Sequence, residues 1–324
     1  MARNSLFGPM DPAPEAGYAD PPKRKGFFTD TSVCIGCKAC EVACKEWNEI
    51  PDDGFNLLGM SYDNTGALGG STWRHVAFIE QPKPLGGQDS GMRRSPVALG
   101  MPSVGAPGVS APDGAPAGDG TGDSDSPDRP EFRWLMSSDV CKHCTHAACL
   151  DVCPTGSLFR TEFGTVVVQD DICNGCGYCV PACPFGVIER RTGAEGTKNV
   201  GIAQKCTLCY DRIGVGQTPA CAQACPTESI QFGDVDELRE RAQQRVEALH
   251  ARGVSEARLY GEDPKDGVGG SGAMFLLLDE PEVYGLPPDP VVTTKELPQM
   301  FNRASAAAVA LLAGAVVSFL GRRR

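Results

Sequence analysis

The stretch Cys173-Asn174-Gly175-Cys176-Gly177-Tyr178-Cys179-Val180-Pro181-Ala182-Cys183-Pro184 has the spacing C-x2-C-x2-C-x3-C, followed at once by proline. Two-residue gaps allow three successive thiolates to ligate three irons of one cuboidal iron–sulfur cluster. The fourth cysteine lies too far along the turn and reaches a second cluster. The stretch therefore predicts a pair of clusters that exchange their fourth ligands.

Variants of this pattern occur four times, so that all 16 cysteines fall into four groups of four. In chain order the groups are Cys34, Cys37, Cys40, Cys44; Cys141, Cys144, Cys149, Cys153; Cys173, Cys176, Cys179, Cys183; and Cys206, Cys209, Cys221, Cys225. The first group has the spacing of the third, whereas the second and fourth have a longer gap before their third cysteine. Structural zinc sites usually pair two C-x2-C hooks around one ion, so four thiolates within eleven residues favour iron–sulfur clusters.

The ferredoxin rule also predicts which groups share ligands. The second and third groups are adjacent and should pair, which leaves the first and fourth to pair across the chain. We expect four [4Fe-4S] clusters with these ligands: Cys34, Cys37, Cys40, Cys225 (cluster 1); Cys206, Cys209, Cys221, Cys44 (cluster 2); Cys141, Cys144, Cys149, Cys183 (cluster 3); and Cys173, Cys176, Cys179, Cys153 (cluster 4). His143 and His146 lie inside the second group, where four cysteines are already present, and are expected to surround the site rather than ligate iron.

The composition excludes several other classes of protein. The 324 residues include 30 basic and 41 acidic side chains, a net charge of −11, which argues against binding to nucleic acid phosphates. Apolar residues make up 41%, enough for a folded core. The first 20 residues contain no apolar run typical of a signal peptide, and the chain is long, so a secreted disulfide scaffold is not expected.

The pairing of the four cysteine groups along the chain predicts an α+β fold of two interleaved two-cluster ferredoxin-like units, which is irregular and loop-rich. Residues 84–130 contain 10 Gly and 8 Pro but no cysteine or aromatic residue, which is typical of disordered sequence. Residues 234–253 carry apolar side chains at helical spacing and predict a surface helix. The expected segments are a flexible arm (1–26), a first/fourth-group unit (27–83 with 200–233), a disordered Gly/Pro-rich insertion (84–130), a second/third-group unit (131–199), and a helix with a partner-facing tail (234–303).

The C-terminal segment 304–320 is uncharged and is followed by Arg322, Arg323 and Arg324. A helix of 17 residues is about 25 Å long, slightly under the hydrocarbon thickness of a bilayer. We expect a single-pass transmembrane helix; the alternative is a buried terminal helix. The positive-inside tendency places the arginines in the cytoplasm and the cysteine-rich body on the extracytoplasmic face of the cell membrane.

No motif for substrate chemistry accompanies the cysteines. The sequence contains no G-x-G-x-x-G after a predicted strand, no P-loop and no G-x-S-x-G. Four redox centres without a catalytic site of their own predict a relay for single electrons.

Several segments resemble a known family. The segment Asp30–Asn48 around the first group resembles the four-cluster subunits of molybdopterin oxidoreductases, and above all the iron–sulfur (β) subunit of membrane-bound respiratory formate dehydrogenase. Similar segments follow at Tyr62-Asp63-Asn64, Lys205–Cys209 with Asp211-Arg212, Pro219–Cys221, Gly267–Gly270 and Tyr284–Pro287, before one terminal hydrophobic helix. The resemblance covers nearly all of residues 27–320 except the insertion.

The resemblance implies a role in anaerobic respiration. Electrons would pass from a molybdopterin-containing catalytic subunit, with molybdenum or tungsten, through the four clusters to a membrane cytochrome b (γ) subunit and quinone. It also offers a route of export without a signal peptide, in which the folded subunit is carried by a catalytic partner with a twin-arginine signal; a cytoplasmic-facing complex is the alternative. The alternatives are the same relay in another molybdopterin reductase or a hydrogenase, and a zinc-binding interaction protein.

Overall fold

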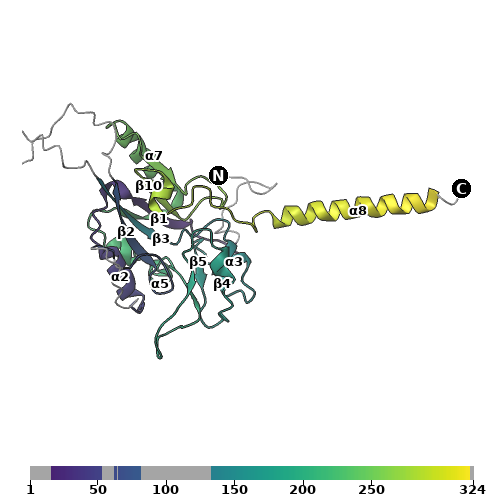
Figure 1. Cartoon of the computed structure of the whole chain (residues 1–324), viewed down its shortest axis with the longest axis horizontal. Helices are drawn as coiled ribbons and strands as arrows, with labels where there is room; N and C mark the ends of the chain where they lie inside the picture. The colour runs from purple at the N-terminus through teal and green to yellow at the C-terminus, as the bar shows by residue number, and fades with distance from the viewer. Residues whose placement is uncertain (1–15, 53–61, 64, 82–132, 322–324) are drawn as a thin grey trace, which may run out of the picture.

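The computed structural model describes residues 16–52, 62–63, 65–81 and 133–321, and shows a mixed, loop-rich body from which one long helix projects (Figure 1). The strands are β1 (Lys25–Asp30), β2 (Arg74–Gln81), β3 (Arg133–Val140), β4 (Leu158–Arg160), β5 (Val166–Val168), β6 (Glu189–Arg190), β7 (Ala203–Gln204), β8 (Ile230–Asp234), β9 (Arg258–Tyr260) and β10 (Ala273–Leu277). The helices are η1 (Thr31–Val33), α2 (Ala39–Trp47), α3 (Ala148–Asp151), α4 (Cys179–Ala182), α5 (Tyr210–Gly214), α6 (Ala220–Gln223), α7 (Val235–His250), η2 (Pro281–Tyr284) and α8 (Leu297–Gly321).

A four-stranded sheet joins segments from distant parts of the chain. Its strand order is β8-β1-β10-β9, with β1 antiparallel to β8 and parallel to β10. Phe27 and Phe28 of β1 are fully buried, as are all five residues of β10, so the sheet lies in the main hydrophobic core. Because β1 leads into the first cysteine group and β8 follows the fourth, this sheet brings those two groups together.

The segment 234–303 contributes more to the core than we expected. The predicted helix is confirmed by α7, whose Leu238, Ala242 and Leu249 are buried against the body. The description of the remainder as a partner-facing tail is wrong for β9 and β10, which are two of the four strands of the sheet. A strand that is buried on both faces has a continuous apolar sequence. Because β10 lacks the alternation of apolar and polar residues typical of a half-buried strand, periodicity did not identify it.

A second sheet consists of the hairpin-like pair β2 and β3. The two strands are antiparallel over eight residues each, from Arg74 opposite Val140 to Gln81 opposite Arg133. The predicted insertion 84–130 falls outside the described residues, and so do residues 1–15 of the predicted arm. The end of that arm is bound to the body, since Lys25 begins β1 and its Nζ lies 2.5 Å from Asp234 Oδ1.

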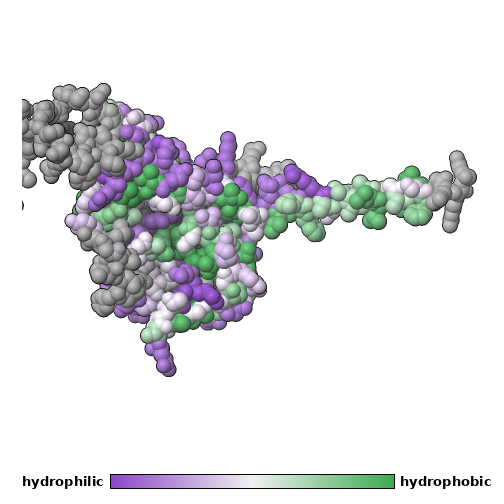
Figure 2. Space-filling view, in the orientation of Figure 1, coloured by the Kyte–Doolittle hydropathy of each residue, from purple (hydrophilic) through white to green (hydrophobic). Residues whose placement is uncertain are grey.

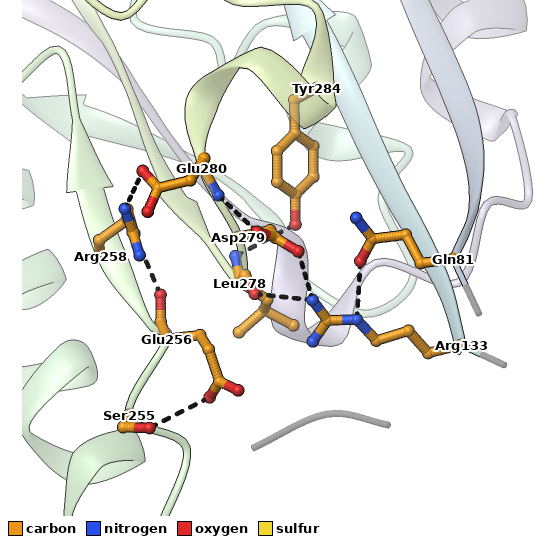
Figure 3. Close-up of polar contacts among 9 residues, drawn as sticks. All are labelled: Gln81, Arg133, Ser255, Glu256, Arg258, Leu278, Asp279, Glu280 and Tyr284. Atoms are coloured by element: carbon orange, nitrogen blue, oxygen red, sulfur yellow. Dashed lines mark hydrogen bonds and ion pairs between the residues drawn. The ribbon is translucent and has the colours of Figure 1, made fainter. Parts of the chain in front are cut away.

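The described residues on either side of the insertion are held by a buried ion pair (Figure 3). Arg133 Nη2 donates to Asp279 Oδ2 at 2.6 Å, and Arg133 Nε donates to Gln81 Oε1 at 2.9 Å. Arg133 and Asp279 are 9% and 6% exposed. The same view contains an exposed counterpart, the pair Arg258–Glu280. The buried pair fastens the end of the β2–β3 ladder to the segment that follows β10.

The two pairs of Figure 3 should differ strongly in their contribution to stability. Asp279→Ala leaves the buried Arg133 charge without its carboxylate and should cost about 3–5 kcal/mol in the free energy of unfolding. Glu280→Ala removes an exposed pair and should cost about 0–1 kcal/mol. Urea unfolding of the detergent-solubilised protein, followed by far-ultraviolet circular dichroism, measures both. Equal costs would show that the Arg133–Asp279 pair does not hold this end of the ladder.

The cysteine-bearing parts of the body are short and irregular. Two-stranded sheets β4–β5 and β6–β7 alternate with helices of four or five residues, and most cysteines lie in the turns and helices between them. Two helix contacts organise these parts: α2 packs against α6, and α3 packs against α4. The first contact joins the first and fourth cysteine groups, and the second joins the second and third groups.

The C-terminal helix α8 is longer than the apolar segment that predicted it. It begins at Leu297 rather than 304 and runs for 25 residues, which is about 37 Å. Its candidate membrane span, Gln299–Leu320, has a mean hydropathy of 1.8, and none of that window is buried against the rest of the structure (Figures 1 and 2). The alternative of a buried terminal helix is therefore wrong. The early start has a local cause, because Pro298 favours the first turn of a helix.

Candidate iron–sulfur centres

All four C-x2-C segments share one backbone feature. The residue just before the second cysteine has a positive φ in each case: Gly36 (65°), His143 (44°), Gly175 (71°) and Leu208 (59°). Left-handed residues in such turns direct successive N–H groups to one side and form the anion-binding concavities found in many iron–sulfur sites. In the fourth group the N–H of Leu208 donates to Cys206 Sγ at 3.3 Å. The four segments therefore share a left-handed residue before the second cysteine, even where glycine is absent.

Thiols of the first and fourth groups face each other. One pocket is lined by Cys34, Cys37, Cys40 and Cys225, together with Ser138 and Ser229. Burial raises the pKa of Cys44, and the neighbouring thiols Cys206, Cys221 and Cys209 raise it further. The α2–α6 contact is the cause, because Cys40 and Cys44 lie on α2 and Cys221 lies on α6.

The second and third groups meet in the same way. A second pocket is lined by Cys141, Cys144, Cys149 and Cys183. Burial raises the pKa of Cys179 to about 11, its backbone N–H opposes this, and the thiols Cys173, Cys176 and Cys153 add to the rise. These two sets correspond in membership to the ligand sets that the sequence predicts for clusters 3 and 4.

The electrostatics of the sites fit ligation of the positively charged iron–sulfide core of a cluster. Burial raises the pKa of Cys40 to about 11 and that of Cys149 to about 12, so the buried sulfurs become thiolates only when a positive charge compensates them. Cys153 is the exception, since hydrogen bonds from Ser157, Leu158 and Thr155 outweigh the effect of its slight burial and lower its pKa to about 7.

The exposure of the cysteines differs along the set. Cys37 of the first group and Cys176 of the third are exposed, whereas Cys141, Cys206 and Cys221 are buried. Burial raises the pKa of Cys206, and Cys141 raises it further, so thiols of the fourth and second groups are neighbours. The exposed cysteines therefore belong to the first and third groups, whereas the second and fourth groups contain none.

Three buried cations lie among the cysteines, and none of them was predicted from the sequence. Arg74, Lys142 and Lys205 are at most 2% exposed. Lys142 and Lys205 are adjacent in sequence to Cys141 and Cys206, which is a signal that could have been used. Arg74 carries no such signal, because its position depends on the β2–β3 ladder. His143, as expected, lies beside the pocket, where its Nδ1 accepts from the N–H of Val166 at 3.1 Å.

Comparison with protein families shows which known domains the cysteine-rich segments match. Residues 33–157 and 132–235 each match a model described as a 4Fe-4S dicluster domain. Two such domains and 16 cysteines account for four [4Fe-4S] clusters, which overturns the zinc alternative.

Curated relatives match over most of the sequence. The protein is 35% identical over 299 residues to the nitrate-inducible formate dehydrogenase iron-sulfur subunit of Escherichia coli, covering 90% of this chain and 83% of the relative. It is 37% identical over 288 residues to the formate dehydrogenase iron-sulfur subunit of Haemophilus influenzae, covering 87% and 74%. The B subunit of the anaerobic dimethyl sulfoxide reductase of Escherichia coli is 30% identical over 216 residues, covering 67% and 76%.

Proposed function

Because the protein belongs to the family of formate dehydrogenase iron–sulfur subunits, we propose that it relays electrons from a molybdopterin-containing catalytic subunit that oxidises formate to a membrane cytochrome b and quinone. The observation that carries this proposal is the match to two dicluster domains by a sequence whose 16 cysteines gather in facing sets. The protein is an electron-transfer subunit rather than a catalytic one. Each bound cluster supplies one-electron chemistry, and the polypeptide ligates it and excludes water from it.

The ligand sets proposed for the four clusters are those predicted from the sequence. The shared pocket of Cys34, Cys37, Cys40 and Cys225 supports cluster 1, and the grouping of Cys44 with Cys206, Cys209 and Cys221 supports cluster 2. The second pocket supports cluster 3, and the neighbours of Cys179 support cluster 4.

The proposed path is linear, from cluster 1 through clusters 2 and 3 to cluster 4. Clusters 1 and 2 share α2, the closeness of Cys141 to Cys206 links clusters 2 and 3, and the α3–α4 contact links clusters 3 and 4. The exposed Cys37 and Cys176 give the path one accessible end on each side.

The two ends of the path suit different partners. Beside Cys37, the exposed rings of Tyr62 and Trp134 form an aromatic group with the half-buried Phe78. The ring centroid of Tyr62 lies 5.6 Å from that of Phe78 and 5.1 Å from that of Trp134. We assign this face to the catalytic subunit. The root of α8 lies at the other end, where Thr294 Oγ1 donates to Asp151 Oδ2 at 2.5 Å beside the second cysteine group. Cytochrome b in the membrane is therefore assigned to the cluster 4 end.

The proposed location is the cell membrane, crossed once by α8. The arginines at 322–324 follow the apolar span directly, and the positive-inside tendency assigns that end to the cytoplasm. The cysteine-rich body then lies on the extracytoplasmic side.

A relay in another molybdopterin reductase or in a hydrogenase is the second candidate. The dimethyl sulfoxide reductase subunit favours it at 30% identity, but that match covers 67% of the chain, whereas the formate dehydrogenase match covers 90%. The difference in coverage supports formate as the electron donor.

Truncation before α8 tests the partners and the location together. The full-length protein, tagged and purified from solubilised membranes, should bring down haem b together with molybdenum or tungsten. A variant ending at 296 should keep the metal of the catalytic subunit, leave the membrane and lose the haem, because α8 is the described helix that is long and apolar enough to span a membrane. A tag placed after Arg324 should resist protease added to spheroplasts. Membrane retention of the truncated variant would locate the anchor in a partner, and a digested tag would reverse the orientation.

A further inference from the structure

Arg74 is a buried guanidinium held firmly at the start of β2. It is 1% exposed, and its Nη1 donates to the carbonyl oxygen of Ser138 at 3.2 Å and to Ser138 Oγ at 3.1 Å. Its Cζ lies 4.9 Å from the ring centroid of Phe27, at the distance of a cation–π contact. These contacts involve three different strands, so the position of the charge is fixed by the fold.

The remaining donors of Arg74 have no partner among the described residues. Its Nε and Nη2 are buried and donate to no oxygen or sulfur of the described residues at hydrogen-bonding distance. Lys142 and Lys205 differ, because each Nζ donates to backbone carbonyls. A buried charge without a counter-charge is strongly destabilising, so a negatively charged group is required beside these two nitrogens.

Cysteine sulfurs from two proposed cluster sites surround Arg74. Arg74 begins β2, which packs against α2, the helix that carries Cys40 and Cys44. Although burial opposes its charge, Cys221, Cys40, Cys206 and Cys44 keep the pKa of Arg74 above its ordinary value. Cys40 belongs to cluster 1, and the other three belong to cluster 2. Ser138 Oγ, which accepts from Arg74, also lies 3.2 Å from Cys40 Sγ. The guanidinium therefore lies between the two sites.

We propose that Arg74 is a positioning residue that sets reduction potentials: its Nε–H and Nη2–H donate to the sulfur atoms of clusters 1 and 2, and its charge makes both clusters easier to reduce. The inference rests on the proposed function and adds to it the control of the first transfer step. A cluster gains one negative charge on reduction, and a nearby cation stabilises that form more than the oxidised form. One cation beside two neighbouring clusters raises both reduction potentials together.

The test compares potentials in anaerobic, dithionite-poised titrations of the purified complex, followed by electron paramagnetic resonance. Arg74→Gln should make reduction of clusters 1 and 2 at least tenfold less favourable, which lowers their reduction potentials by about 59 mV or more for a one-electron couple. The potentials of clusters 3 and 4 should not change. Arg74→Lys keeps the charge and should leave the potentials of clusters 1 and 2 near their native values. Arg191→Gln is the matched control, because Arg191 is also buried but has no cysteine among its charged neighbours.

Unchanged potentials of clusters 1 and 2 in an Arg74→Gln complex with full iron content overturn the proposal, and so does an equal shift in Arg191→Gln. If Arg74→Gln fails to assemble, the native complex decides. With arginine labelled with 15N in the guanidinium, electron–nuclear double resonance on reduced cluster 1 or 2 should show a 15N coupling, and its absence rejects the contact. A native complex without iron clusters would instead reject the proposed function, so the two failures are distinguishable.

Discussion

Replacing Cys225 with alanine is expected to remove the cluster held by Cys34, Cys37 and Cys40, although Cys225 lies about 190 residues further along the chain. The shared pocket is the physical reason, since Cys225 lines the same hollow as the first cysteine group. The iron content of the purified protein should fall from about sixteen to about twelve atoms. The resonance signal assigned to cluster 1 should disappear, and that of cluster 2 should remain.

Cys221 supplies the matched control, because it lies four residues before Cys225 but neighbours Cys44 and does not line the pocket of Cys34, Cys37 and Cys40. Cys221→Ala should remove cluster 2 and lose the same amount of iron. We therefore expect two variants only four residues apart to lose different clusters. If both variants lose the cluster of the fourth group, each group binds its own cluster, and the exchange of ligands between groups is wrong.

The cysteine pattern predicted the chemistry because iron–sulfur ligation depends on local spacing. Two-residue gaps such as Cys34 to Cys37 require a tight turn, and the structure has that turn in every group, with Gly36 and Gly175 in the left-handed conformation that glycine allows. At the equivalent position of the fourth group, Leu208 adopts the same conformation without a glycine. The cysteine spacing was therefore a more general signal than the glycine pattern.

The parts that the sequence did not predict depend on contacts between distant segments. The burial of β10 arises from its pairing with β1, which lies almost 250 residues earlier in the chain. Arg74 belongs to the site only because β2 pairs with β3 and places it beside Ser138 and Phe27. A single sequence carries no local pattern for such pairings, so periodicity could not identify them.

The first residue of α8 was predicted incorrectly for a different reason. Hydropathy identified only 304–320, because charged and polar residues such as Arg303 precede that run. Helix formation is cooperative, and polar residues extend an existing helix at little cost. The observed helix therefore begins at Leu297, and its length is sufficient to cross the hydrocarbon core of a bilayer.

Reduction by formate is the measurement that tests the electron relay most directly. The complex, purified without oxygen in detergent, should develop the paramagnetic signals of reduced clusters when formate is added, because the proposed path connects the catalytic subunit to all four clusters. In the Cys225→Ala complex, formate should no longer reduce clusters 2, 3 and 4, since the accessible end of the path beside Cys37 is lost. Dithionite should still reduce them, which separates a broken path from damaged clusters. Signals that appear with dithionite but not with formate in the native complex would contradict the assignment to formate dehydrogenase.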